Sequence, residues 1–290
     1  EQVSAEVPAL RLLARAAHGS MRDALSLTDQ AIAFGSGSLQ EATVRQMLGS
    51  VDRSYVFRLL QALAKGDGKT VVETSETLRT HGLSAASTLE EMSGVLQRMA
   101  VLQAVPGLDG GDASDPEAAE VQRLAVTDAL TNLLNRRGIF EQAQKEVEIA
   151  QKLNLPLALL WLDLDHFKSI NDQYGHHIGD EVVREVATRV RAALRDRDLV
   201  GRYGGEGGDE YIIVLPETDL ARAHQVAERL RAIVSETAIL TSKGPLTITA
   251  SIGVTSLNDD TEELDALLHR ADESMYAAKT AGRNRVSTHT

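Results

Sequence analysis

The stretch that decides the fold is Gly207-Gly208-Asp209-Glu210-Tyr211, followed directly by the apolar run Ile212-Ile213-Val214-Leu215. Two glycines permit a tight turn, and the apolar run after the acidic pair predicts a buried strand. A second acidic site, Asp163-Leu164-Asp165, ends another apolar run that begins at Leu157. Carboxylates at the ends of neighbouring strands are typical of a site for a hard divalent cation and a nucleotide phosphate.

Helices and strands alternate in the second part of the chain, for which we expect a domain over residues 124–290. Strand 246–255 alternates apolar and polar residues, as in a sheet that is covered on one face. We therefore expect an α+β fold with helices packed on one side of the sheet. Apolar periodicity predicts helices at 117–126, 137–153, 179–194, 219–235 and 263–281, and strands at 157–163, 199–203, 211–215 and 246–255.

The first part of the chain shows helical periodicity without the alternation of β-branched residues that strands require. Apolar stripes over 10–17 and 24–32 are separated by Gly19-Ser20, a break with a cap-like serine. Further helices are predicted over 38–48, 55–64, 69–80 and 87–103. We expect an all-helical domain over 1–106, joined by a Gly/Asp/Pro-rich linker over 107–123.

Composition excludes several function classes. The 290 residues include 30 basic and 42 acidic side chains, a net charge of −12, and we expect no direct nucleic-acid binding. No apolar stretch approaches membrane-spanning length, so no membrane partner is expected. There are no cysteines, which excludes disulfides and thiolate metal sites and fits a reducing, cytoplasmic location.

Several polar residues carry possible chemistry beside the acidic site. Asp165 is partly explained as a helix cap, whereas Asp163 would leave a carboxylate beside an apolar sheet. Asn171 and Asp180, in a turn-rich segment, could read a purine edge or simply form turns. Lys279 and Arg283 are four residues apart on a predicted helix, where they could clamp a polyphosphate or complement the helix dipole.

Spaced motifs in the second part resemble the GGDEF domain of diguanylate cyclases, from about Asp128 to Val286. Several motifs in the right order are more specific than any one of them. They are Asp128-Ala-Leu-Thr-Asn-Leu-Leu-Asn-Arg-Arg137, Asp163-Leu-Asp-His-Phe-Lys-Ser-Ile-Asn-Asp172, Tyr174-Gly-His-His-Ile-Gly-Asp180, Arg202-Tyr-Gly-Gly, Gly207-Gly-Asp-Glu-Tyr211 and Ala271-Asp-Glu-Ser-Met-Tyr-Ala-Ala-Lys-Thr-Ala-Gly-Arg-Asn-Arg285.

The resemblance implies an antiparallel-rich sheet like a polymerase palm or nucleotidyl cyclase, GTP as substrate and cyclic di-GMP as product. It implies that two domains must face each other, in a homodimer or a higher homo-oligomer. Its implied site comprises Mg²⁺ or Mn²⁺ on Asp163, Asp209 and the Leu164 carbonyl, with Glu210 assisting metal binding or deprotonation, Asn171 and Asp180 on guanine, and Phe167, Lys168, Lys279 and Arg283 around the phosphates.

Two further features bear on that site. Arg195 and Asp198 fit the product-inhibition pattern of the family, although a charge cluster at a helix end explains them equally well. The turn also carries three extra residues, as though Gly-Gly-Glu were written twice. Alignment from the preceding strand makes Glu206 the metal ligand, and alignment from the following strand makes it Asp209. We favour Asp209, because strand 212–215 fixes its face, and catalytic competence depends on this insertion.

The N-terminal part resembles the lid end and collar domain of bacterial DNA polymerase III subunit gamma/tau. His18-Gly-Ser-Met-Arg-Asp-Ala-Leu-Ser-Leu-Thr-Asp-Gln-Ala-Ile32 carries this resemblance, and the sequence given contains no phosphate loop. Three functions therefore stay open. They are a cyclase whose helical part promotes association, a degenerate module that binds GTP or cyclic di-GMP without catalysis, and an assembly fragment that binds clamp-loader subunits.

Overall fold

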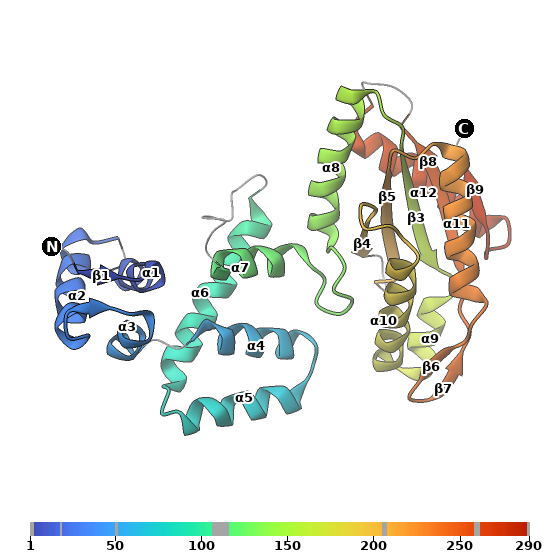
Figure 1. Ribbon diagram of the computed structural model, residues 1–290. Coiled ribbons are helices and arrows are strands. Elements are labelled where there is room, and N and C mark those ends of the chain that lie inside the picture. The colour runs from blue at the N-terminus through green and yellow to red at the C-terminus, as the bar shows by residue number, and fades with distance from the viewer. Residues whose placement is uncertain are drawn as a thin grey trace. The chain divides into compact units, whose positions relative to one another are not determined.

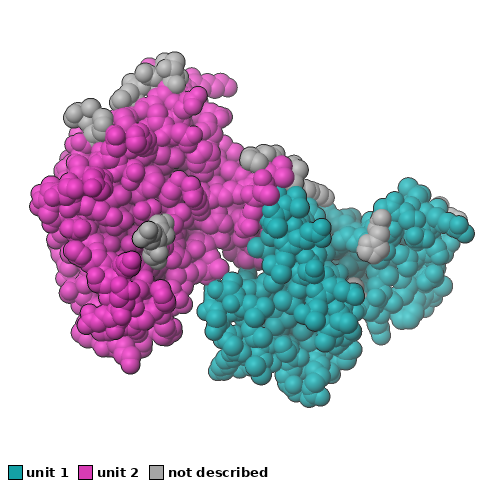
Figure 2. All heavy atoms as spheres, turned by 180° about the vertical axis from the view of Figure 1, so that it is seen from behind, with its two compact units in different colours: residues 1–101 teal, residues 102–290 magenta. Residues whose placement is uncertain are grey.

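The computed structural model divides the chain into two compact units, Glu1–Val101 and Leu102–Thr290, which Figure 2 colours separately. It describes residues 3–17, 19–49, 52–105, 116–204, 208–257 and 262–288. The predicted linker, 107–123, belongs to the second unit, and its residues 107–115 lie outside the described ranges. No helix within the described ranges combines the length and the apolar character needed to cross a lipid bilayer.

The first unit is built from helices, as expected. Ser20 caps α2 by accepting a hydrogen bond from the Asp23 N–H group, which explains the break predicted there. Short strands β1 and β2 pair in parallel, an addition that two-residue strands could not reveal in the sequence. The elements are β1 (Ser4–Ala5), α1 (Val7–Ala16), α2 (Met21–Phe34), β2 (Ser38–Leu39), α3 (Glu41–Leu48), α4 (Arg53–Ala64), α5 (Gly68–Thr80) and α6 (Ala85–Ala104), whose last residues enter the second unit.

The second unit is a mixed helix and sheet fold around a five-stranded sheet of order β4-β5-β3-β8-β9 (Figure 1). All pairings in this sheet are antiparallel except that of β8 with β9. The elements are α7 (Pro116–Val126), α8 (Arg136–Leu153), β3 (Leu157–Leu164), α9 (Phe167–Tyr174), α10 (His176–Ala192), β4 (Leu199–Gly204), β5 (Glu210–Pro216), α11 (Leu220–Ser235), β6 (Ile239–Thr241), β7 (Gly244–Leu246), β8 (Ala250–Ser256), α12 (Leu264–Thr280) and β9 (Val286–Thr288).

Helices cover both faces of this sheet, so the expectation of helices on one side was wrong. Alternate residues of β3 face opposite ways: Leu160 and Leu162 pack with α10 and α11, whereas Leu159 and Trp161 pack with α8 and α12. The alternation in β8 was misleading, because its polar residues Ser251 and Thr255 are buried as well.

The packing of α12 against β8 depends on one glycine. A Cβ atom at Gly253 would lie 2.0 Å from the Ala271 carbonyl oxygen and 2.3 Å from the Met275 nitrogen. Only a residue without a side chain lets the helix backbone approach the strand this closely. This contact positions α12, which carries Lys279 to the end of β3.

Candidate active site

The two acidic stretches lie side by side at one end of the sheet. In the antiparallel pairing of β3 with β5, Asp163 stands opposite Glu210, and the Leu164 N–H group donates to the Asp209 carbonyl oxygen at 3.3 Å. Asp163 shares its sheet face with Trp161, and Glu210 shares the same face with Ile212. The backbone therefore brings the carboxylates of Asp163 and Glu210 together on the side of the sheet that α12 covers.

Lys279 forms an ion pair with this acidic cluster from the last turn of α12. Its Nζ atom lies 2.7 Å from Asp163 Oδ2, and the Asp163 side chain is only 6% exposed. Burial raises the pKa of Asp163 to about 6; the Lys279 ammonium opposes this rise, and the charge of Asp209 adds to it. Burial also raises the pKa of Glu210, and the charges of Asp163 and Asp209 raise it further. Burial and mutual repulsion thus disfavour the charged form of these carboxyl groups, and a bound cation would offset both effects.

Asn171 and Asp180 come from two consecutive helices, α9 and α10, and both side chains are half-buried. Gly179 makes room for Asn171, because a Cβ atom at Gly179 would lie 1.9 Å from Asn171 Oδ1. The structure thus places the Asn171 amide against the backbone of the residue that precedes Asp180.

Phe167 and Lys168 form the first turn of α9, which follows His166 in a left-handed conformation. The Phe167 side chain is buried in the core, whereas that of Lys168 is exposed. Any contact of Phe167 with a nucleotide must therefore come from its backbone. N–H groups in the first turn of a helix are suited to binding phosphate oxygens.

Arg283 does not lie on the helical face that carries Lys279, so that expectation was wrong. Helix α12 ends at Thr280, and Arg283 has a φ angle of 59°, which is incompatible with a continuing right-handed helix. Its N–H group donates to the Ala278 carbonyl oxygen at 3.1 Å, which folds the chain back against the helix end. Lys279 therefore lies on the helix, and Arg283 lies on a separate turn after it.

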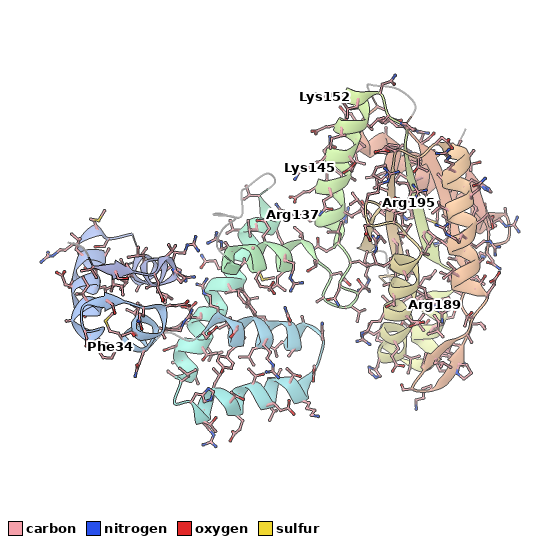
Figure 3. All side chains as sticks on the ribbon, in the orientation of Figure 1. Phe34, Arg137, Lys145, Lys152, Arg189 and Arg195 are labelled. Carbon is pink, nitrogen blue, oxygen red and sulfur yellow. The ribbon has the colours of Figure 1, made fainter. Side chains whose placement is uncertain are left out.

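Arg195 and Asp198 lie in the turn between α10 and β4. Asp198 is buried, and its Oδ2 atom accepts a hydrogen bond from the Arg195 N–H group at 2.9 Å. The Arg195 side chain, which Figure 3 labels, is exposed. Among the described residues, nothing donates to the buried Oδ1 atom of Asp198. The Oδ2 atom of Asp198 therefore closes the turn, and its Oδ1 atom takes no part.

The expectation that Asp165 partly caps a helix was wrong. The N-cap residue of α9 is His166, and no side chain forms a cap hydrogen bond there. Asp165 is instead buried beneath the site, where its oxygens accept from the Thr249 and Ser251 hydroxyl groups and from the Asn284 N–H group. Its partners lie 84 to 119 residues away along the chain, so no local pattern could reveal them.

Arg202 supports the turn that precedes Asp209, a role that the sequence reasoning also missed. Its Nε atom donates to the Gly208 carbonyl oxygen at 2.7 Å, and its guanidinium lies 3.3 Å from Asp128 Oδ2. A Cβ atom at Gly208 would collide with this guanidinium at 2.2 Å. Glu206, the alternative metal ligand, lies outside the described residues.

Comparison with known proteins identifies both parts of the chain. The family model described as "Diguanylate cyclase, GGDEF domain" matches residues 125–285. The models for the ATPase lid domain of the DNA polymerase III clamp loader subunit and for domain III of subunits gamma and tau match residues 1–37 and 39–174. The last of these overlaps the beginning of the GGDEF match.

Relatives with similar sequences come from several bacteria. The chain is 46% identical over 165 residues to the response regulator PleD of Caulobacter vibrioides, a match that covers 56% of this chain and 36% of PleD. It is 38% identical over 207 residues to the diguanylate cyclase DgcP of Pseudomonas aeruginosa, covering 71% of this chain and 30% of DgcP. The chain thus spans about a third of the length of these curated relatives.

Solved structures agree with this result. The GGDEF domain of DgcB from Caulobacter crescentus, crystallised with c-di-GMP, is 32% identical with a TM-score of 0.54, covering 57% of this chain and 93% of that one. The diguanylate cyclase SiaD from Pseudomonas aeruginosa, solved with its activator SiaC, is 27% identical with a TM-score of 0.55, covering 91% and 97%. Because the GGDEF model matches more than half of its residues, the chain belongs to the GGDEF family of diguanylate cyclases.

Proposed function

We propose that this protein is a diguanylate cyclase that joins two GTP molecules into cyclic di-GMP and releases two pyrophosphates. The observation that carries this proposal is the convergence of Asp163, Asp209 and Glu210 at paired strand ends, beside Lys279. The name of the relative DgcP, a diguanylate cyclase, and the c-di-GMP in the DgcB structure support the choice of product.

The acidic cluster suits Mg²⁺ or Mn²⁺. Its oxygen donors are those that hard cations prefer, and burial together with mutual repulsion disfavours their charged state until a cation arrives. Among the described residues, no group of three or more acidic or histidine side chains is arranged to hold a metal ion by itself. This fits Mg²⁺, which usually binds one or two carboxylates and takes its remaining ligands from water and substrate phosphates. Asp163, Asp209 and the Leu164 carbonyl would hold the ion, which would supply charge neutralisation at the phosphates.

The protein's own residues would position the nucleotide. Asn171 and Asp180 would bind the guanine edge, and Phe167 and Lys168 would bind phosphate from the first turn of α9. Lys279 now neutralises Asp163, and we infer that it turns to the β- and γ-phosphates with Arg283 when nucleotide and cation enter together.

The reaction needs the second units of two chains to face each other, because each of them holds one such set of groups. The 3′-hydroxyl oxygen of one GTP attacks the α-phosphorus of the other, and the bond between α-phosphorus and the pyrophosphate oxygen breaks. Glu210, whose pKa is raised, would accept the hydroxyl proton on its carboxylate or assist in holding the cation. A homodimer or higher homo-oligomer would bring two units together, and we propose that the N-terminal helical unit promotes this association.

Turnover of GTP tests the proposal. The purified chain, at several protein concentrations with Mg²⁺ or Mn²⁺, should form cyclic di-GMP with a specific activity that rises with concentration. Asp163→Ala and Asp209→Ala should each abolish product, whereas Glu206→Ala should have a mild effect. Absence of product at high protein concentration, with GTP bound, would instead support the degenerate binding module.

The inserted turn is the observation that favours this second candidate. In the degenerate module, GTP or cyclic di-GMP would bind without reaction, and the Arg195–Asp198 turn would be the product site. Calorimetry with each nucleotide distinguishes the two functions. The third candidate function is an assembly fragment that binds clamp-loader subunits. It is suggested by the matches to the gamma/tau family models, and co-purification with clamp-loader subunits is its test.

A further inference from the structure

Asp165 ties together three parts of the chain directly beneath the proposed active site. Its Oδ2 atom accepts from the Thr249 hydroxyl group at 2.6 Å and from the Asn284 N–H group at 3.0 Å, and its Oδ1 atom accepts from the Ser251 hydroxyl group at 2.7 Å. The residue is 4% exposed. The donors come from the segment before β8, from β8 itself and from the turn after α12, so one carboxylate joins them to the end of β3.

The turn that Asp165 holds contains an unfavourable backbone conformation. Arg283 and Asn284 have φ angles of 59° and 44°, in the left-handed region, which asparagine tolerates and arginine disfavours. Such residues persist where surrounding contacts fix them. Here the Asn284 N–H group is held by Asp165, and the Asn284 side-chain oxygen accepts from Arg231 at 3.0 Å.

We propose that Asp165 is a positioning residue that fixes Arg283 for phosphate binding. Asp163 lies two residues before Asp165 on the same strand end, and Arg283 directly precedes Asn284. The bond from the Asn284 N–H group to Asp165 therefore links the end of β3, which carries Asp163, directly to the residue that follows Arg283. This inference rests on the proposed function, because it assumes that Arg283 contacts the GTP phosphates.

The role requires hydrogen-bond acceptors rather than negative charge. Both carboxylate oxygens already face donors, so a metal ion would have to displace them. An asparagine can keep the arrangement: its amide oxygen can take the Oδ2 position and accept from Thr249 and Asn284. Its amide nitrogen can then donate to the Ser251 hydroxyl oxygen, because a hydroxyl group can accept as well as donate.

Nucleotide binding by the full chain tests this. We would measure the dissociation constants of a non-hydrolysable GTP analogue and of GMP, which lacks the β- and γ-phosphates, by calorimetry with Mg²⁺. Asp165→Ala should weaken GTP-analogue binding about tenfold, the equivalent of one charge-assisted hydrogen bond, and change GMP binding less than about threefold. Asp165→Asn should stay within about threefold of wild type for both ligands.

Asp165→Glu is the matched variant, because it keeps the charge and moves the acceptors by one methylene group. Asp165→Glu should weaken binding of the GTP analogue as much as Asp165→Ala does. If the Ala variant fails to fold, the dissociation constants of the Asn and Glu variants still test the proposal. Equal damage from Asn and Ala, or equal loss of GMP and GTP-analogue affinity, would overturn the inference. Failure of the wild type to bind the analogue would instead refute the proposed function itself, and this inference with it.

Discussion

Replacing the buried Asp163 with asparagine should stabilise the second unit at pH 8, although it removes a proposed metal ligand. The pKa of this carboxyl is raised from 3.8 to about 6 in the folded protein, and its side chain is only 6% exposed. A difference of roughly two pKa units corresponds to about 3 kcal/mol. The charged form of Asp163 therefore lowers the free energy of unfolding by at most about 3 kcal/mol, with the Lys279 ion pair already included.

The sign of the pH dependence follows from proton binding. The folded state keeps the Asp163 proton up to about pH 6, whereas the unfolded chain releases it near 3.8. The unfolded state thus binds fewer protons between these values, and the contribution of Asp163 to stability falls as the pH rises through this window. Asparagine has no such proton. The free energy of unfolding of the variant should therefore equal that of wild type below pH 4, and it should exceed that of wild type by the full difference at pH 8.

Urea unfolding, monitored by tryptophan fluorescence, would measure this difference in the stability of the second unit. Trp161 is the one tryptophan of the chain, and it lies on β3 two residues before Asp163. The experiment needs a chelator, since a bound cation would offset the destabilising effect of the charged Asp163 carboxylate in wild type. Asp196→Asn, at an exposed position in the α10–β4 turn, is the control and should change nothing. A less stable Asp163→Asn variant at pH 8, or a stability gap equal at pH 4 and pH 8, would refute the reasoning.

Three further outcomes are expected. Millimolar Mn²⁺ should raise the thermal midpoint of wild type and leave that of Asp163→Asn unchanged, because binding to the folded state alone stabilises it; equal shifts would argue against a site at Asp163. Arg202→Lys should lower kcat about tenfold at unchanged helicity by circular dichroism, because the planar fork that holds the Gly208 carbonyl is lost. Gly253→Ala should lower the free energy of unfolding by about 1 to 3 kcal/mol in the urea assay, because the new Cβ atom would lie 2.0 Å from the Ala271 carbonyl oxygen.

The central strands could be predicted because their apolar runs are long and continuous. Every residue of β3 is buried, and the interior of β5 is equally so, which is the pattern of strands covered on both faces. The acidic residues at the ends of these two runs followed from the same pattern. By contrast, β9 has three residues and pairs only at the sheet edge, too short a segment for periodicity to detect.

The second covered face was missed because polar residues are buried in β8. Ser251 lies within the sheet with its hydroxyl group bonded to Asp165, so its polarity does not mean that it faces water. A similar error affected Arg283, since spacing of four residues implies a shared face only while the helix continues. The helix ends at Thr280, and the N–H group of Asn284 is bound by Asp165, 119 residues away in the sequence.

The strand pairing on both sides of the inserted turn bears on which acid would serve as ligand. From Leu199 to Arg202, β4 pairs with β5 in continuous register, and this register shifts between Arg202 and Gly204. The other side of β5 pairs with β3 through to Glu210 opposite Asp163. Asp209 directly precedes β5, and its carbonyl oxygen accepts from the Leu164 N–H group at the end of β3, so the pairing of these two strands helps to fix its position. The contact with Leu164 at the end of β3 favours Asp209 over Glu206 as the proposed metal ligand.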